Sequence, residues 1–325
     1  MIITALAAVA GLPAIGQRTQ PISEQNVRAE MYFLASDAMQ GRGSATGYER
    51  IAAEYIGSQF MQFGLEPAGQ PGFDGKPTYV QAVAFKRRNG TDGMTYNAIG
   101  KITGTDKTIG SQVILITAHL DHLGTRDTLP GDDKIFNGAD DDASGSIAVL
   151  ELARTLAAGK KPKRTVYFVC FGSEEIGGFG AAYFVNNLPF PKDKLVANLE
   201  FEMIGRPDTA VKPDELWLTG YERSDLGPEM AKRGAKLVKD PHPEQNFFRR
   251  SDNYTLARQG IIAHTVSSYG LHSDYHKVTD EIRTIDFVHM TKSINSMIEP
   301  IQWLINSNFV PAWNPGQNPQ EAPKP

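Results

Sequence analysis

The alternation of short apolar runs with helical segments after residue 111 constrains the fold of this chain most strongly. The runs Val113–Thr117 (VILIT) and Thr165–Phe171 (TVYFVCF) are almost wholly apolar, and helical patterns follow them at Ser144–Leu156 and Gly180–Asn186. A strand with no polar alternation is typical of a sheet that is covered on both faces. The pattern therefore predicts a single α/β catalytic domain with a mostly parallel mixed sheet and helices on both faces.

Other segments extend this pattern in both directions. Residues 23–65 predict two helices that lead into the domain, and Thr46 to Glu49 (TGYE) matches a capping box at the start of the second. Residues 66–95 predict loop and edge strand. The remaining expected elements are strands at Leu195–Met203, Glu215–Thr219 and Ile261–Ser267, a helix around Leu226–Val238, and a long last helix from Thr284.

The two ends of the chain differ from the domain in composition. Residues 2–16 are almost wholly apolar, but the run is shorter than a membrane span and Pro13 interrupts it. We expect residues 1–16 to be a signal peptide, cleaved before Gln17, so that the protein is exported to the periplasm or secreted, with no stable membrane span. The domain then occupies residues 17–310, and the Pro-, Asn- and Gln-rich residues 311–325 predict a flexible tail.

The charge and the cysteine content argue against nucleic-acid binding and against cysteine-based sites. The 33 basic and 37 acidic residues give a net charge of −4, which provides no basic surplus for binding nucleic acid. The single cysteine, Cys170, can form neither an intramolecular disulfide nor a cysteine-rich zinc site, and we expect it to be buried. Any metal site must therefore use His, Asp and Glu.

Potential ligands follow the ends of the predicted strands, where open α/β sheets place their binding sites. The side chains in question are His119 and Asp121 after the first strand, Asp140–Asp142 before a helix, Glu174 and Glu175 after the second strand, Glu202 at the end of the third, and His276 after the fourth. Because so many carboxylates would repel one another in one crevice, bound cations are the natural counterions.

A pair of zinc ions suits this inventory. One aspartate bridging the two ions, with one imidazole and one further carboxylate on each, requires two histidines and three carboxylates. The adjacent Glu174 and Glu175 can divide two tasks, since one can bind zinc while the other transfers protons.

The motifs TAHLDHLG, NGADDDASG, FGSEEIGGFG, NLEFEMIGR and HSDYHKVTDE occur here in a specific order. Together with the lead segment LASDAMQGRGSATGYERIAAEYI, these motifs give the chain a resemblance to the co-catalytic dizinc metallo-exopeptidases. These are the bacterial leucyl aminopeptidases, with glutamate carboxypeptidases and glutaminyl cyclases as relatives. The resemblance covers residues from about 30 to 305.

The resemblance implies a ligand set for two zinc ions per chain. In it, Asp141 bridges the ions, His119 and Glu202 complete the first site, and Glu175 and His276 complete the second. The family often has a cis peptide bond after the bridging aspartate, here between Asp141 and Asp142. Glu202 stands where aspartate is more common.

The resemblance also implies the roles of the residues around the metals. Asp121 orients the imidazole of His119, Glu174 is the general base, and Tyr275 lies near the substrate carbonyl. The implied reaction is removal of residues from peptides with a free N-terminus, by attack of a hydroxide held by the two zinc ions. A carboxypeptidase, a glutaminyl cyclase with one zinc, and a non-catalytic binding module remain alternatives.

Five further residues near these motifs carry expectations of their own. We expect His122 to lie at the surface rather than to line the mouth of the site, and His272 to be near the site without binding substrate. Ser251 and Asp252 are expected to cap the next helix. Arg206 is a candidate partner for a carboxylate.

Overall fold

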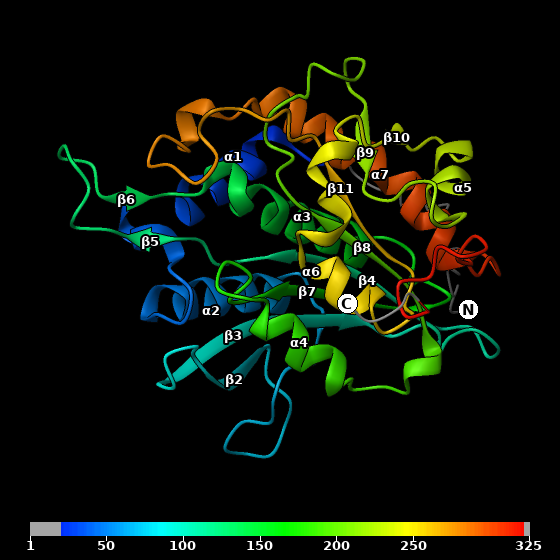
Figure 1. Cartoon of the computed structure of the whole chain (residues 1–325). Helices are drawn as coiled ribbons and strands as arrows, with labels where there is room; N and C mark the ends of the chain where they lie inside the picture. Colours follow the sequence, from blue (N-terminus) through cyan, green and yellow to red (C-terminus); the bar gives the residue numbers. More distant parts are fainter. Residues whose placement is uncertain (1–20, 322–325) are drawn as a thin grey trace, which may run out of the picture.

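The computed structural model describes residues 21–321, so the predicted signal peptide lies outside the described residues. A nine-stranded sheet runs through the centre of the molecule (Figure 1). Its strands are β1 (Glu66–Pro67), β2 (Val80–Lys86), β3 (Asp92–Ile102), β4 (Val113–His119), β7 (Thr165–Phe171), β8 (Leu195–Phe201), β9 (Leu216–Leu218), β10 (Leu237–Lys239) and β11 (Ala263–Ser267). The short strands β5 (Gly124–Thr125) and β6 (Ile135–Phe136) form a separate hairpin.

The strand order is β1-β3-β7-β4-β8-β11-β9-β10, with β2 paired to β3. Strands β7, β4, β8 and β11 are parallel to one another, whereas β3 and β9 run antiparallel to their neighbours β7 and β11. The predicted mostly parallel mixed sheet is therefore confirmed. The four parallel strands all end at the same edge, which is where the polar motifs follow them.

Helices cover both faces of this sheet, because its central strands are apolar on both sides. In β4, Ile114 and Ile116 pack into one core and Leu115 into the other. The first core includes residues of α1 (Glu24–Leu34), α2 (Gly47–Gln62), α3 (Gly145–Ala158), α5 (Leu226–Lys232) and α7 (Phe287–Asn306). The second includes residues of α4 (Phe179–Asn186) and α6 (Asp252–Ala257), and Figure 1 shows α3 and α4 on opposite sides of the sheet.

The N-terminal lead forms the two predicted helices. The side chain of Thr46 caps α2 by accepting from the backbone N–H groups of Tyr48 and Glu49, at 3.2 and 3.5 Å. The other half of the expected capping box does not form, because the side chain of Glu49 turns inward. Its carboxylate accepts from the hydroxyls of Thr95 and Ser173.

Two segments differ from expectation. The predicted helix Leu226–Val238 ends at Lys232, because Gly234 adopts a left-handed conformation (φ +97°) and the chain continues as β10. Residues 311–321, expected to be a flexible tail, begin with defined contacts: the indole of Trp313 donates to the carbonyl of Gly260 and its ring packs on Phe248. Within residues 21–321, no helix is both long and apolar enough to span a membrane.

Candidate metal centre

The parallel strands bring the predicted ligands together at one edge of the sheet. His119 is the last residue of β4, Glu202 directly follows β8, and Glu174 and Glu175 lie in the turn after β7. Asp141 comes from an irregular turn at Ala139–Ser144 that leads into α3. His276 follows β11 in a loop, where its backbone takes a left-handed conformation with φ +55°.

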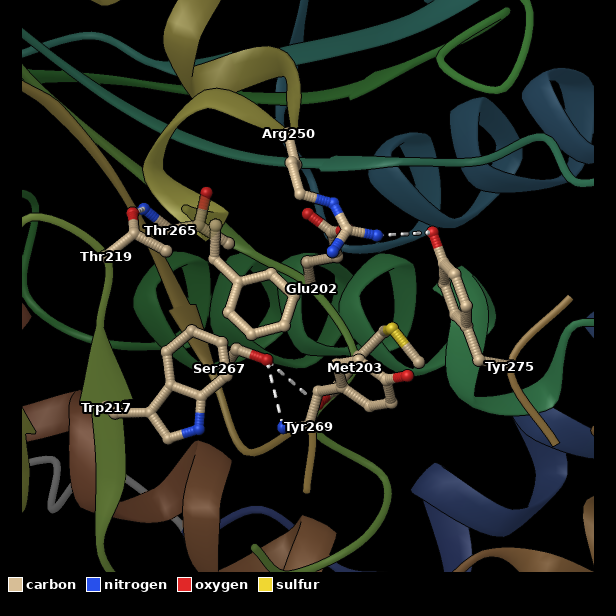
Figure 2. Close-up of a pocket in the computed structure, with 10 residues that line it drawn as sticks. Glu202, Met203, Trp217, Thr219, Arg250, Thr265, Ser267, Tyr269 and Tyr275 are labelled. Carbon is tan, nitrogen blue, oxygen red and sulfur yellow. Dashed lines mark hydrogen bonds between the residues drawn. The ribbon is translucent and has the colours of Figure 1, made fainter. Parts of the chain in front are cut away.

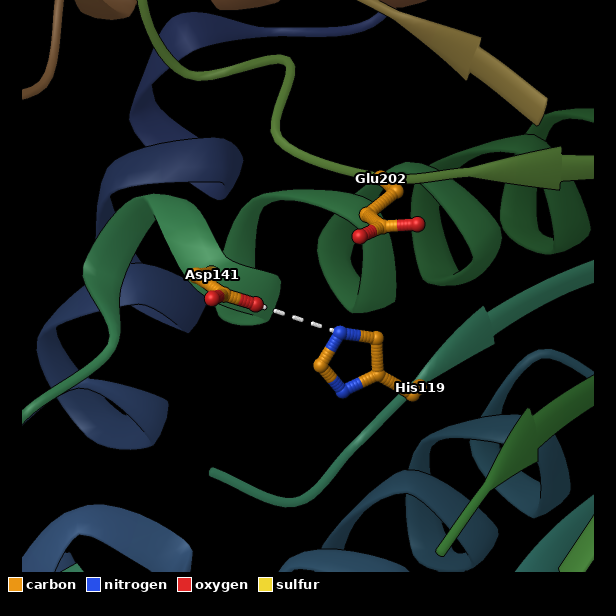
Figure 3. Close-up of side chains that lie close together, drawn as sticks. All are labelled: His119, Asp141 and Glu202. Atoms are coloured by element: carbon orange, nitrogen blue, oxygen red, sulfur yellow. Dashed lines mark ion pairs between the residues drawn. The ribbon is translucent and has the colours of Figure 1, made fainter. Parts of the chain in front are cut away.

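His119, Asp141 and Glu202 form the first cluster, and their side chains converge in Figure 3. One potential ligand atom from each lies within 4.8 Å of those of the other two. The Nε2 atom of His119 is 3.2 Å from the Oδ1 atom of Asp141. This buried nitrogen nevertheless has no partner in hydrogen-bonding geometry. A nitrogen and an oxygen that are close but not aligned with each other fit two ligands directed at a common ion.

A second cluster lies on the other side of Asp141. The Nε2 atom of His276 is 3.2 Å from Asp141 Oδ2 and 3.2 Å from Glu175 Oε2. His122 also belongs to this cluster, with Nδ1 at 2.8 Å from Glu175 Oε1. The buried Oε1 atom of Glu175 has no partner in hydrogen-bonding geometry either. These nitrogen and carboxylate donors, with no thiolate, fit a divalent cation such as zinc.

Asp141 is the side chain that the two clusters share. Burial works to raise the pKa of its carboxyl group, but the imidazoles of His119 and His276 outweigh burial and hold that pKa well below its usual range. Asp141 is therefore an ionised carboxylate with one oxygen facing each cluster. This is the arrangement that a bridging ligand requires.

The other acids of the triplet have structural partners. The Asp142 carboxylate accepts from the backbone N–H groups of Gly145, Met203 and His119, at 2.9, 3.1 and 3.2 Å. The peptide bond between Asp141 and Asp142 is cis, as the resemblance implied.

Asp140 and Asp280 fix the position of this turn. Asp140 accepts from the backbone N–H of Gly205 at 2.8 Å and pairs with His272 at 2.9 Å. The buried carboxylate of Asp280, for which the sequence predicted no role, accepts from the backbone N–H groups of Asp140 and Asp141. Asp280 lies in the quoted motif HSDYHKVTDE, but the sequence pattern did not indicate this role.

Asp121 connects the end of β4 to the Glu174–Glu175 turn. Its carboxylate accepts from the hydroxyl of Ser44 and from the backbone N–H groups of Glu174 and Glu175, at 3.0 and 3.4 Å for the latter two. The Nδ1 atom of His119 lies closer to the backbone oxygen of Asp121, at 3.2 Å, than to its carboxylate, at 3.7 Å. Asp121 thus contacts the imidazole mainly through its main chain.

Glu174 lies beside the first cluster in a strongly acidic environment. Burial raises the pKa of its carboxyl group well above the usual range, and the negative charges of Asp252 and Glu202 act in the same direction. His119 opposes these effects. A carboxylate with a raised pKa is suited to accept a proton near neutral pH.

Glu202 and Glu200 have different surroundings although they share a strand face. Glu200 is fully buried, and its carboxylate accepts from the hydroxyls of Ser251 and Thr265, at 3.0 and 3.3 Å, and from the backbone N–H of Asn253. Glu202 instead faces His119 and Asp141, and burial raises its pKa to about 7. The two glutamates are therefore not interchangeable as ligands.

A pocket opens next to the first cluster (Figure 2). Its wall includes Glu202 and the stacked rings of Trp217 and Phe247, whose centroids are 5.3 Å apart. Tyr275 also lines it, and its hydroxyl accepts from Arg250 at 3.4 Å. The Tyr275 ring stacks on His276 with centroids 3.9 Å apart, so the two residues form one wall between pocket and metal cluster.

Two expectations for residues near the site require correction. His122 was expected at the surface, but it is fully buried, because Gly138 in the loop before Asp141 packs against its ring. Ser251 occupies the position before α6 yet does not cap that helix, since its hydroxyl donates to Glu200. Arg206, in contrast, does have a carboxylate partner: it pairs with Asp274 at 2.8 Å and holds the loop that carries Tyr275 and His276.

The lead segment also contacts the metal centre, through Arg42. Its buried guanidinium donates to the carbonyl oxygens of Leu34, Leu120, Asn137 and Gly138 at 2.7–2.9 Å. These carbonyls belong to α1 and to the two loops that lead into His122 and Asp141. Arg42 lay in a quoted motif, but the sequence pattern did not indicate this role.

Comparisons with known proteins agree with this geometry. Residues 97–299 match peptidase family M28. The chain is 36% identical over 115 residues to leupeptin-inactivating enzyme 1 of Streptomyces exfoliatus and 36% identical over 117 residues to an aminopeptidase of Pseudomonas aeruginosa. Each match covers 35% of this chain, but only 23% and 19% of those relatives, so the chain spans about a fifth of the length of these two relatives.

A solved structure extends the likeness to the whole fold. The aminopeptidase from Aneurinibacillus sp. strain AM-1 superposes with a TM-score of 0.67 at 14% sequence identity, over 90% of this chain and 97% of the other. At that identity the likeness concerns the fold. The family match covers most of the chain and contains every residue of the two clusters. The chain belongs to peptidase family M28.

Proposed function

We propose that this chain is a dizinc aminopeptidase, which hydrolyses the first peptide bond of substrates with a free N-terminus. The position of Asp141 carries the proposal. Its Oδ1 atom faces His119 and its Oδ2 atom faces His276, each at 3.2 Å. Two imidazoles on opposite oxygens of one buried carboxylate support two ions that share a bridge.

Bound zinc ions would be held by His119, Asp141 and Glu202 on one side and by Asp141, Glu175 and His276 on the other. When bound, such ions lower the pKa of a water molecule and polarise the scissile carbonyl. Glu174 accepts the proton of the attacking water and delivers it to the leaving amine, for which its raised pKa is suited. The Tyr275 hydroxyl is placed to donate to the carbonyl oxygen as it gains negative charge.

The pocket supports cleavage at the amino end of peptides. Glu202 lies in its wall beside the first cluster, so a free ammonium group entering the pocket meets a carboxylate. The rings of Trp217 and Phe247 offer an apolar surface to the first side chain of the substrate. The names of two relatives, an aminopeptidase and a leupeptin-inactivating enzyme, support the proposal that the substrates are peptides.

We further propose that the protein is exported, on the basis of the apolar residues 2–16. Expression of the full chain in a bacterial host should yield a mature N-terminus at Gln17 in the periplasmic or culture fraction. Recovery of uncleaved protein only in the cytoplasm would contradict this part of the proposal.

The catalytic proposal is tested by two measurements on one preparation. Elemental analysis should find about two zinc ions per chain, and a dipeptide series should be cleaved only when the amino group is free. N-acetylated counterparts are the matched controls. Cleavage that ignores the acetyl group would favour a carboxypeptidase, and a single zinc with cyclising activity would favour a glutaminyl cyclase.

A further inference from the structure

His122 is a buried histidine that the proposed mechanism does not use. Its side chain is fully buried, and neither ring nitrogen has a partner in hydrogen-bonding geometry. A buried imidazole without aligned hydrogen bonds is costly, since its nitrogens lose their contact with water. A metal ion bound to Nδ1 would satisfy one of these two nitrogens.

The Nδ1 atom of His122 is directed toward the second metal cluster. It lies 2.8 Å from Glu175 Oε1 and 3.8 Å from Asp141 Oδ2. Two ligands at about 2.0–2.1 Å from one zinc ion are about 2.9 Å apart at a right angle and about 3.3 Å apart at a tetrahedral angle. The distances around Nδ1 bracket this range, and Glu175 Oε1 is likewise buried without a hydrogen bond.

His276 approaches the same carboxylates from the other side. Its Nε2 atom is 3.2 Å from Asp141 Oδ2 and from Glu175 Oε2, whereas His122 faces the other oxygen of Glu175. The two imidazole rings are 5.8 Å apart between centroids and inclined by 72°. Glu175 is thus flanked by two imidazoles, one on each oxygen.

The packing around His122 holds its ring in this position. Gly138 lies against it so closely that a Cβ atom there would come within 2.5 Å of the His122 ring. Gly138 also has a left-handed backbone (φ +59°), and its carbonyl oxygen accepts from Arg42. A side chain at position 138 would push the imidazole away from Glu175.

We propose that His122 is a further ligand of the second metal, which it shares with His276, Glu175 and Asp141. The inference rests on the proposed dizinc function. It gives the second ion four protein side chains, and leaves the first ion with His119, Glu202 and the shared Asp141. Closed four-ligand sites are typical of tightly held zinc, whereas catalytic sites keep an open position. The open coordination position therefore belongs to the first ion, beside the pocket, and the second ion binds more tightly.

Cobalt substitution tests this ligand set without measuring activity. The protein is loaded with two equivalents of Co²⁺, and proton NMR counts the imidazole rings whose signals are shifted by the paramagnetic ions. We expect three shifted rings in the native protein, two in His122→Ala, and three in the control His272→Ala. The control ring pairs with Asp140, which is not a ligand.

The outcomes separate this inference from the proposed function. Two shifted rings in the native protein, with two cobalt ions bound, would refute the role of His122 and leave the dizinc centre intact. Failure to bind a second ion would refute both. If His122→Ala does not fold, the number of shifted imidazole rings in the native protein and in His272→Ala still tests the proposal, since three rings support it and two refute it. With folded variants, zinc competition against a chelator should show one site weakened by about 100-fold or more in His122→Ala and unchanged in His272→Ala.

Discussion

The buried His264, behind the pocket wall, should make the protein sensitive to acid. Its Nδ1 atom lies 2.7 Å from the carbonyl oxygen of Thr219, which can only accept, so this nitrogen carries the proton. Nε2 then accepts from the hydroxyl of Ser224 at 2.7 Å. The neutral ring is thus fully hydrogen-bonded, and burial lowers the pKa of His264 from 6.5 to about 4.

This lowered pKa sets the direction and size of the pH effect. Above pH 6.5 the histidine is neutral in both the folded and the unfolded state, so it adds no pH dependence to the free energy of unfolding. Between pH 6.5 and 4 the unfolded chain binds a proton that the folded chain does not bind. The free energy of unfolding therefore decreases as the pH is lowered through this range. A difference of about 2.5 pKa units corresponds to about 3 kcal/mol.

The test compares the native protein with His264→Asn, whose amide can still donate to the carbonyl of Thr219. Urea unfolding is measured from pH 7 to pH 4, at one fixed metal load. Groups other than His264 titrate in both proteins, so their effects cancel in the difference between the two unfolding free energies. Between pH 7 and 4 the native protein should lose about 3 kcal/mol more than the variant.

A second variant separates titration from hydrogen bonding. Ser224→Ala removes the hydroxyl that donates to His264 but leaves the buried ring, so it should lower stability at every pH and keep a steep dependence on acid. Parallel curves for the native protein and His264→Asn would refute the reasoning, because they would show that the buried imidazole titrates as it does in water.

The remaining predictions concern the metal centre and the pocket. Glu174→Gln should retain both zinc ions by elemental analysis and lower kcat by about 10²–10⁴-fold, and full turnover would contradict its role in proton transfer. Asp141→Ala should lose both ions, whereas Glu200→Gln, a change at a buried carboxylate of β8, should keep them; equal zinc contents in the two variants would refute the bridge. Removing zinc with a chelator should lower Tm, and restoring it at about 100 times its Kd should return about 2.7 kcal/mol per site; an unchanged Tm would argue against ions bound to the folded state. Trp217→Ala should cost about 3–5 kcal/mol in urea unfolding, because the ring is buried and stacked, and a cost below about 1 kcal/mol would show that the pocket wall is loosely packed.

The sequence predicted the fold well where apolar runs are continuous. Strand β7 has the expected bounds, and β4 extends the expected strand by two residues to His119. The error at Val238 arose because helical periodicity continues past Gly234, whose left-handed backbone ends the helix. Local patterns cannot show such a change when the next strand is only three residues long.

The sequence predicted some residues of the candidate site but not others. Residues at strand ends meet because parallel strands end together, so His119, Glu175 and Glu202 could be placed from order alone. His122 could not be placed in this way, since its burial depends on how the loop before Asp141 packs over it. The role of Asp280 could not be predicted either, because its carboxylate accepts from backbone N–H groups that are about 140 residues away in the sequence.

The four carbonyl oxygens held by Arg42 have a consequence for how much of the chain is needed for a working centre. The family match begins at residue 97 and contains every metal-facing side chain, whereas Arg42 and Ser44 come from far upstream. A fragment cut to the matched segment would keep all the ligands and lose the cation that ties their loops together. The smallest transplantable form of this candidate metal centre therefore starts at α1, and a designer who grafts it onto another scaffold must graft a guanidinium with it.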